Sequence, residues 1–307
     1  MGVGAQSFTV DTPAEYCVAY QGDKGKLRVA TFNSHQEWSD HGDQQSVGIT
    51  GSPAMVTYKG RNFCLHQGQS PGDSGTLWCG EFTYSPSDAS FHFTDTKVAG
   101  AAISGSPAVA VFKDLLYCFY QGCSGGKADA SLRCQTYDGR TWSEVSTLFK
   151  GAVIENPAAA TYKDSLYCAF GGKGAVLIYT AFNGKDWSEP EAARVYLSCS
   201  PSLVEYDSKL YCLHQDDNLI EGNLEWNVFD GQGWQWDSMV KSVGMAGSPA
   251  GTVIPATNGR SARICCVHRG ETGNDLWHTY FDGTTWTRDL IQPVGDAEDS
   301  PAVLRVA

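Results

Sequence analysis

The sequence predicts an all-β fold, a six-bladed β-propeller with four antiparallel strands in each blade. One pattern, opened by Ser-Pro or Asn-Pro, recurs six times at intervals of 44 to 54 residues, a period typical of propeller blades. Aromatic residues make up 12% of the chain and glycines number 34, which suits short strands joined by tight turns. We therefore expect residues 1–307 to form one domain. The six repeats open at Ser52, Ser106, Asn156, Ser200, Ser248 and Ser300.

Each repeat contains four strand-like segments. The first follows Ser-Pro, as in 54–60 and 108–114, and its proline lies at the strand's start, where no ladder hydrogen bond is lost. The second contains Leu-Tyr-Cys, as in 210–216, and the third ends in Phe-Asp-Gly, as in 276–283. The fourth follows an Asp/Asn-Gly-x-x-Trp turn, whose glycine supplies the positive φ that a tight hairpin needs.

The first blade lacks an opening strand of its own, whereas the chain ends in an unused one, SPAVLRVA at 300–307. We expect this C-terminal strand to join the N-terminal strands and close the ring, because closure leaves no open sheet edge. The predicted blades are 300–307 with 13–45, 52–98, 106–149, 156–195, 200–241 and 248–292.

The eleven cysteines do not predict a disulfide framework. Six of them occupy the same position in the second strands of different blades, which lie too far apart for a bridge. We expect buried free thiols, typical of a reducing compartment. One local bridge, Cys118 to Cys134, stays open as an alternative. The six equivalent cysteines are Cys17, Cys64, Cys118, Cys168, Cys212 and Cys266.

Composition excludes several classes of partner. The net charge is −12 and the 22 basic residues are scattered, so no nucleic-acid partner is expected. No apolar run reaches the roughly 18–20 residues that a membrane span needs, so we expect no membrane insertion. The N-terminal residues do not have the pattern of a secretory signal. The expected location is the cytoplasm, or outside the cell after release without a signal peptide.

Candidate binding residues gather where the second strand of a blade ends and the third begins. Aromatic rings stack on the C–H faces of sugars, and Gln, His and Arg hydrogen-bond sugar hydroxyls. Alternatively, the glutamines bond loop backbone and the tryptophans pack between blades. Blade 4, with Phe170, Gly171 and Ile178, lacks the polar groups. The candidates are His66, Gln67, Trp78, His214, Gln215, Trp226, His268, Arg269, Trp277, Tyr20, Gln21, Arg28, Tyr120, Gln121 and Arg133.

The densest acidic group lies in and beside the loop of blade 5, with Asp216, Asp217, Glu221 and Glu225. We interpret it as a solvated loop, with a calcium ligand set as the alternative. No spacing of cysteine and histidine suits zinc, and no cofactor is otherwise expected.

The Asp/Asn-Gly-x-x-Trp turns at 138–142, 183–187, 230–234 and 282–286 are similar to the Asp-box of sialidase-type propellers, without its preceding serine. The whole repeat resembles the bacterial and fungal β-propeller lectins that bind fucose or galactose, including the six-bladed fungal fucose lectins. This resemblance covers nearly the full chain and implies sugar sites between adjacent blades. No complete binding motif of that family repeats unchanged here.

The predicted function is therefore a carbohydrate-binding lectin with several sugar sites on one rim and with glycans or glycoconjugates as partners. Two alternatives remain open. One is an enzyme with a pocket at the mouth of the central channel, where shape and a few donors do the chemistry. The other is a protein-interaction module. A sialidase mechanism is disfavoured because no arginine-bearing motif of that family is present.

Overall fold

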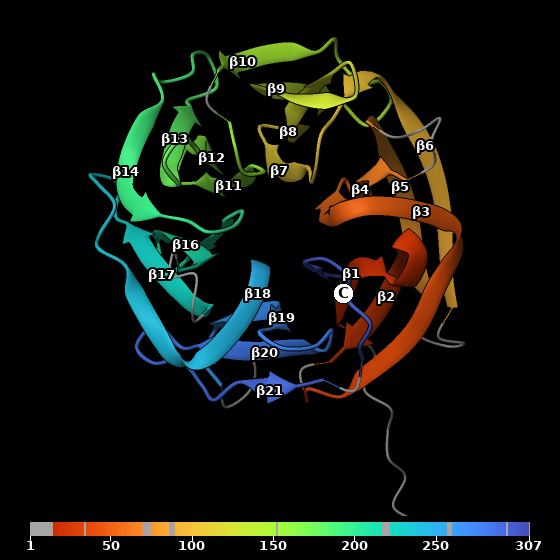
Figure 1. Ribbon diagram of the computed structural model, residues 1–307, viewed down its shortest axis with the longest axis vertical. Coiled ribbons are helices and arrows are strands. Elements are labelled where there is room, and N and C mark those ends of the chain that lie inside the picture. Colours follow the sequence, from red (N-terminus) through yellow and green to blue (C-terminus); the bar gives the residue numbers. More distant parts are fainter. Residues whose placement is uncertain are drawn as a thin grey trace, which may run out of the picture.

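The computed structural model describes residues 15–33, 35–69, 75–85, 90–151, 153–216, 222–256, 260–292 and 294–306. Within them, antiparallel strands surround a central opening (Figure 1). One 3-10 turn, η1 (Asp23–Gly25), is the helical element of the described chain. Among these residues, no helix has the length and apolar character needed to cross a membrane.

The strands form four sheets. The first has the order β22 (Ala302–Arg305), β1 (Tyr16–Gly22), β2 (Lys26–Phe32), β3 (Trp38–Tyr58), β4 (Arg61–Gly68), β5 (Thr76–Ser85), β6 (Ser90–Ala102). The second has the order β10 (Ser146–Lys150), β9 (Lys127–Tyr137), β8 (Leu115–Ser124), β7 (Ala108–Phe112). The third has the order β11 (Ala158–Tyr162), β12 (Ser165–Gly171), β13 (Val176–Phe182), β14 (Glu191–Tyr196). The fourth has the order β15 (Ser202–Tyr206), β16 (Lys209–Gln215), β17 (Asn223–Phe229), β18 (Ser238–Ile254), β19 (Arg263–Gly270), β20 (Leu276–Phe281), β21 (Leu290–Ile291).

Two strands, β3 and β18, are longer than the sequence predicts, because each joins the last strand of one repeat to the first strand of the next. Their pairing register shifts between Thr50 and Ala54 and between Ala246 and Ala250. The shifts flank Pro53 and the equivalent proline of β18, which have no N–H to donate to a ladder. We call the four strands of each repeat a module and number the modules 1 to 6, with β3 and β18 each divided between two modules.

The two ends of the described chain meet in module 1. Strand β22 pairs antiparallel with β1, with Ala302 opposite Ala19 and Arg305 opposite Tyr16. The sequence predicts this pairing, and it supplies module 1 with the opening strand that its own repeat lacks. The last strand of the described chain is thus held in the same sheet as the first, as Figure 1 shows.

The Ser-Pro and Asn-Pro pairs of all six repeats line the central opening. The side chain of one pair accepts a hydrogen bond from the backbone N–H of the preceding one, which links neighbouring modules. The bonds run from Ser52 N to Ser106 Oγ (2.8 Å), from Ser106 N to Asn156 Oδ1 (2.9 Å), from Asn156 N to Ser200 Oγ (3.1 Å) and from Ser248 N to Ser300 Oγ (2.7 Å).

The apolar cores lie between modules rather than inside any one of them. One cluster joins Tyr16 and Val18 of module 1 to Cys265 and Val267 of module 6. All eleven cysteines are free, and ten are buried, Cys123 being half-buried. The alternative bridge from Cys118 to Cys134 is therefore absent. Burial raises the pKa of the buried thiols, that of Cys134 to about 12, so they pack as small apolar groups.

The Asp/Asn-Gly-x-x-Trp turns form as the sequence predicts. Their glycines, such as Gly231 and Gly283, have φ values of 102° and 97°. The side chain of the first turn residue accepts two backbone N–H bonds, as Asp282 does from Thr284 and Thr285, both at 2.8 Å. These bonds complete the turn and hold the pKa of the Asp282 carboxyl below its usual range.

Candidate functional site

A buried leucine begins the equivalent part of every third strand and gives a common reference for the six modules. Each leucine lies opposite the last residue of the candidate group on the second strand, as Leu224 lies opposite Gln215 and Leu276 opposite Arg269. The six leucines are Leu27, Leu77, Leu132, Leu177, Leu224 and Leu276.

The residue after each leucine occupies what we call the gap position, since its side chain faces the space next to the preceding module. It lies opposite a buried Tyr, His or Phe of the second strand. The opposed pairs are Tyr20 with Arg28, His66 with Trp78, Tyr120 with Arg133, Phe170 with Ile178, His214 with Glu225, and His268 with Trp277.

Module 5 departs from the sequence-based alignment, which grouped Trp226 with Trp78 and Trp277. The gap position holds Glu225, and Trp226 is one residue further along the strand. Neighbouring strand residues face opposite sides, so Trp226 packs toward module 6, with its ring centroid 4.9 Å from that of Phe281. Counting from Leu224 rather than aligning tryptophans would have identified Glu225.

The four candidate glutamines are engaged by backbone. Each bonds the segment that connects its own module to the next one, which is the role that the alternative interpretation gives them. Gln21 and Gln67 accept from the N–H of Gly51 and Gly105, each at 2.7 Å. Gln121 Nε2 donates to Val153 O (2.6 Å); Gln215 accepts from Gly247 N (3.1 Å) and donates to Met245 O (3.1 Å).

The three candidate histidines are fully buried, and each bonds a carboxylate of its own module. The distances from the histidine Nε2 atom to the carboxylate oxygen are 3.0 Å for His66 and Asp95, 3.1 Å for His214 and Asp237, and 3.1 Å for His268 and Asp289. In each ring, Nδ1 lies 3.1 to 3.3 Å from the carbonyl oxygen of the following residue. The histidine therefore connects the second strand to the fourth strand or to the residue just before it.

The histidine and the glutamine of one module therefore lie at different junctions between modules. The gap-position side chain lies beside the preceding module, while the glutamine reaches the connection to the following one. The residues that the sequence analysis grouped within a module are divided between two junctions. A site between modules 5 and 6 contains Trp277 and the His268–Asp289 pair of module 6. Strand β18 of module 5 faces these side chains.

A pocket lies at this 5–6 junction. Two glycines make room in it: a Cβ on Gly244 would approach Glu271 to 2.8 Å, and one on Gly270 would approach the Trp277 ring to 2.6 Å. The pocket thus offers an aromatic ring and carboxylates side by side. It is lined by Ser242, Gly244, Gly270, Glu271, Thr272, Trp277 and Asp289.

The equivalent positions of modules 1 and 3 hold arginines that are paired locally. Arg28 bonds Asp40 (2.8 Å) and Asp296 (3.1 Å), and Arg133 bonds Asp129. Tyr20, opposite Arg28, is buried, and burial raises the pKa of its hydroxyl to about 12. Its hydroxyl donates to the Gly295 carbonyl (3.2 Å), and the equivalent Tyr120 hydroxyl donates to Gln135 (2.9 Å). Trp78 and Arg269 are half-buried at their junctions.

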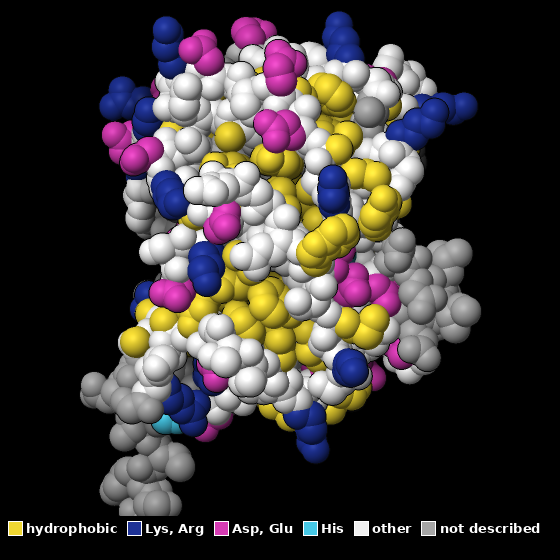
Figure 2. All heavy atoms as spheres, turned by 90° about the vertical axis from the view of Figure 1, so that its left-hand side faces the viewer, with side chains coloured by type: hydrophobic (Ala, Val, Ile, Leu, Met, Phe, Trp, Pro, Cys, Tyr) yellow, Lys and Arg dark blue, Asp and Glu magenta, His cyan; other side chains and the backbone are white. Residues whose placement is uncertain are grey.

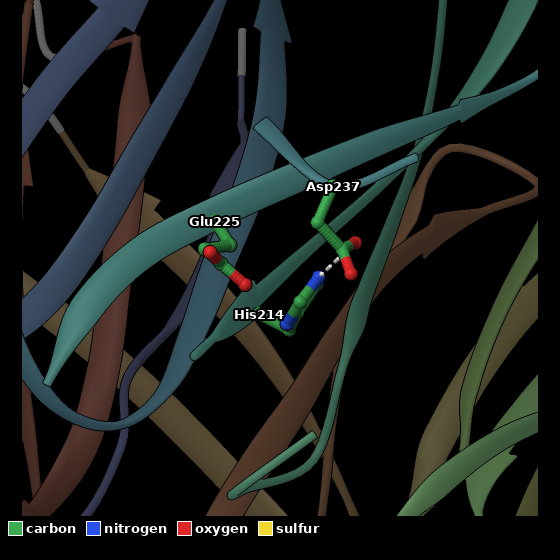
Figure 3. Close-up of side chains that lie close together, drawn as sticks. All are labelled: His214, Glu225 and Asp237. Carbon is green, nitrogen blue, oxygen red and sulfur yellow. Dashed lines mark hydrogen bonds and ion pairs between the residues drawn. The ribbon is translucent and has the colours of Figure 1, made fainter. Parts of the chain in front are cut away.

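The acidic group of module 5 is divided. Asp216 is buried and accepts bonds from the backbone and side chain of Asn223, at 3.3 and 3.2 Å. Asp217 and Glu221 lie outside the described residues. Glu225 instead lies with His214 and Asp237, and one ligand atom from each of the three lies within 4.8 Å of the others (Figure 3).

Charge on the described surface is mixed. On the face that Figure 2 shows, Lys and Arg side chains stand singly among acidic and apolar ones, with no continuous basic patch. The described residues that line the central opening are small or apolar, and every module contributes a proline that follows Ser or Asn.

Solved structures with a similar fold include fungal lectins. The Aleuria aurantia lectin, described as a six-bladed β-propeller with a novel mode of fucose recognition, matches with a TM-score of 0.67 and 13% identity, over 90% of each chain. AofleA from Arthrobotrys oligospora matches with a TM-score of 0.67 and 12% identity, over 94% of this chain and 85% of its own.

The fold resembles that of fungal β-propeller lectins. A sialidase of Trypanosoma rangeli matches less well, with a TM-score of 0.54 and 12% identity, over 86% of this chain and 51% of its own. These likenesses confirm the resemblance that the repeat pattern indicated, and at such identities they concern the fold. No protein-family model matches the chain, and no curated protein matches it in sequence.

Proposed function

We propose that the chain is a carbohydrate-binding lectin whose six modules are the blades of a propeller closed by the β22–β1 pair. The observation that carries the proposal is the pocket between modules 5 and 6, with Trp277 beside Glu271 and Asp289. An aromatic face binds the C–H side of a pyranose, and a carboxylate accepts strong charge-assisted bonds from sugar hydroxyls. The proposal is also supported by the Aleuria aurantia lectin, which has a similar fold and recognises fucose.

The charge of the pocket selects among sugars. Glu271 and Asp289 are its ionisable lining residues in the described chain, and neither Lys nor Arg lines it. Carboxylates repel an anionic sugar such as sialic acid and accept hydrogen bonds from a neutral one. We therefore propose a neutral sugar, with fucose tested first because the Aleuria aurantia lectin recognises it.

Polar side chains at the other junctions support fewer sites than the sequence predicts. Arg28 and Arg133 are engaged by local carboxylates, and the gap position of module 4 is the apolar Ile178. The proposal therefore gives the 5–6 junction the main site and the 1–2 junction, with Trp78 beside the His66–Asp95 pair, a second and weaker one.

A glycan array followed by calorimetry tests the proposal. The full chain should bind neutral, fucose-containing glycans, and Trp277→Ala should reduce affinity at least about tenfold because hot-spot aromatics contribute on the order of 2 kcal/mol. Trp226→Phe, at a neighbouring ring that packs toward module 6, is the matched control and should bind as the parent does. Absence of binding to any glycan by a folded chain would leave the enzyme and protein-interaction alternatives in its place.

A further inference from the structure

The 4–5 junction carries a different set of groups from the 5–6 junction. His214 of β16, Glu225 of β17 and Asp237, just before β18, converge there, and Figure 3 shows both carboxylates directed at the imidazole ring. We propose that these three side chains form a binding site for one divalent transition-metal ion of the Zn²⁺ class. This inference does not depend on the proposed lectin function.

The ring of His214 lies between two acceptors, as do the rings of His66 and His268. Nδ1 lies 3.1 Å from the carbonyl oxygen of Gln215, and Nε2 lies 3.1 Å from an oxygen of Asp237. Both oxygens only accept hydrogen bonds, whereas a neutral imidazole has a single N–H. A neutral ring therefore leaves one lone pair facing an acceptor. A second proton or a metal ion on Nε2 removes that conflict.

Glu225 distinguishes this site from the two equivalent His–Asp pairs in modules 2 and 6. In modules 2 and 6 the same His–Asp pair faces a tryptophan, so the pair and its gap position contain one carboxylate. In module 5 a second carboxylate lies within 4.8 Å of the same imidazole. The three side chains thus place two carboxylates around one imidazole, and His214 is fully buried. A divalent cation balances both carboxylates while the ring stays neutral.

The ligand types select the ion. Imidazole with carboxylates suits Zn²⁺, Co²⁺ and Mn²⁺, whereas Ca²⁺ takes 6–8 oxygen ligands. Zn²⁺ bound tetrahedrally at about 2.1 Å requires ligand atoms roughly 3.4 Å apart, close to the 3.1 Å between His214 Nε2 and Asp237 Oδ1. The Nδ1–H bond to the Gln215 carbonyl orients the ring, as outer partners of metal-bound histidines do. Three protein ligands leave one position for water or an external ligand.

Metal titration of the full chain tests the proposal. Calorimetry with Zn²⁺ in a Cys123→Ser background, which removes the half-buried thiol, should give one equivalent. Co²⁺ should give an absorption spectrum without the charge-transfer band of a thiolate ligand. Glu225→Gln should weaken Zn²⁺ binding by at least the roughly 10–100-fold that loss of an outer partner costs. His268→Asn, in the counterpart pair of module 6, is the matched control and should leave binding unchanged.

A gain-of-binding variant gives a second, independent test. Trp78→Glu places a carboxylate opposite His66, which already pairs with Asp95, and should add a second Zn²⁺ equivalent. Thermal melting without metal confirms that each variant folds. Failure of the parent chain to bind one equivalent, unchanged binding in folded Glu225→Gln, or equal loss in His268→Asn would each overturn the proposal. So would the lack of a second equivalent in folded Trp78→Glu.

Discussion

The 4–5 and 5–6 junctions share a framework and differ at one strand position. Each has a buried histidine that bonds an aspartate at 3.1 Å and the carbonyl of the next residue at 3.1 Å. The gap position holds Glu225 in one and Trp277 in the other. The first junction thus gathers the three side chains of the proposed metal site, and the second places an aromatic ring beside carboxylates.

In each module, the residues that form the scaffold are therefore separate from the position that varies in chemistry. The scaffold consists of the opening Ser/Asn-Pro pairs, the reference leucines and the Asp/Asn-Gly turns, which recur because each forms backbone bonds or core contacts between modules. The gap position faces a junction and forms no part of these bonds, so its side chain can change without disturbing the ladder. Arg, Trp, Ile and Glu all occupy it.

The largest effect should come from removing the aspartates of the two pairs. Asp289 is 8% exposed, whereas Asp237 is 22% exposed and has Glu225 beside the same imidazole. Asp289→Ala should lower the free energy of unfolding by about 3 kcal/mol, because it leaves the buried His268 without its partner. Asp237→Ala should cost about half as much, since water and Glu225 can replace the lost group. Urea denaturation measures both, and equal losses would contradict this account of the two junctions.

An effect of similar size should appear as pH dependence at module 6. His278 is buried where module 5 has Trp226, and burial, followed by the charges of His268 and Arg263, lowers the pKa of His278 from 6.5 to about 4. The unfolded chain binds a proton below pH 6.5 that the folded chain takes up only near pH 4. The contribution of His278 to the free energy of unfolding is therefore fully present above pH 6.5, and it falls by on the order of 3 kcal/mol as the pH is lowered to 4.

The variant His278→Phe should remove that part of the pH dependence and keep the ring packing against Tyr280. Denaturant titrations of parent and variant at several pH values between 4 and 7 check it. Identical slopes for the two proteins would mean that His278 does not titrate as its burial requires.

The smallest effect should come from neutralising one carboxylate at each junction. Glu271→Gln should weaken binding of a neutral glycan roughly tenfold, because a charge-assisted hydrogen bond becomes an ordinary one, a difference of about 1–1.5 kcal/mol. Glu225→Gln lies at the other junction and should leave glycan affinity unchanged. Calorimetry with one glycan compares them, and the reverse order of effects would place the sugar at the 4–5 junction.

Much of the fold could be predicted because it rests on local, repeated chemistry. The Asp-Gly turns are determined by two residues each, and the unused SPAVLRVA segment indicates its own partner. The site was predicted less well. The sequence analysis placed His66, Gln67 and Trp78 in one group, whereas the structure gives the glutamine to the connection with the next module. From the sequence, Glu225 is grouped with the acidic loop of blade 5, as a solvated group or a calcium ligand, whereas the structure places it with His214 and Asp237.

The repeat, the pairing of the last strand with the first module, the tight turns and the free buried cysteines could all be predicted from the amino-acid sequence. Each of these follows from the spacing of residue types along the chain. The junction that each side chain faces became known from the three-dimensional arrangement, because neighbouring residues of a strand point to opposite sides and a shift of one position exchanges them. Glu225 and Trp226 differ by that single step, and it directs one toward a candidate metal site and the other into the apolar core.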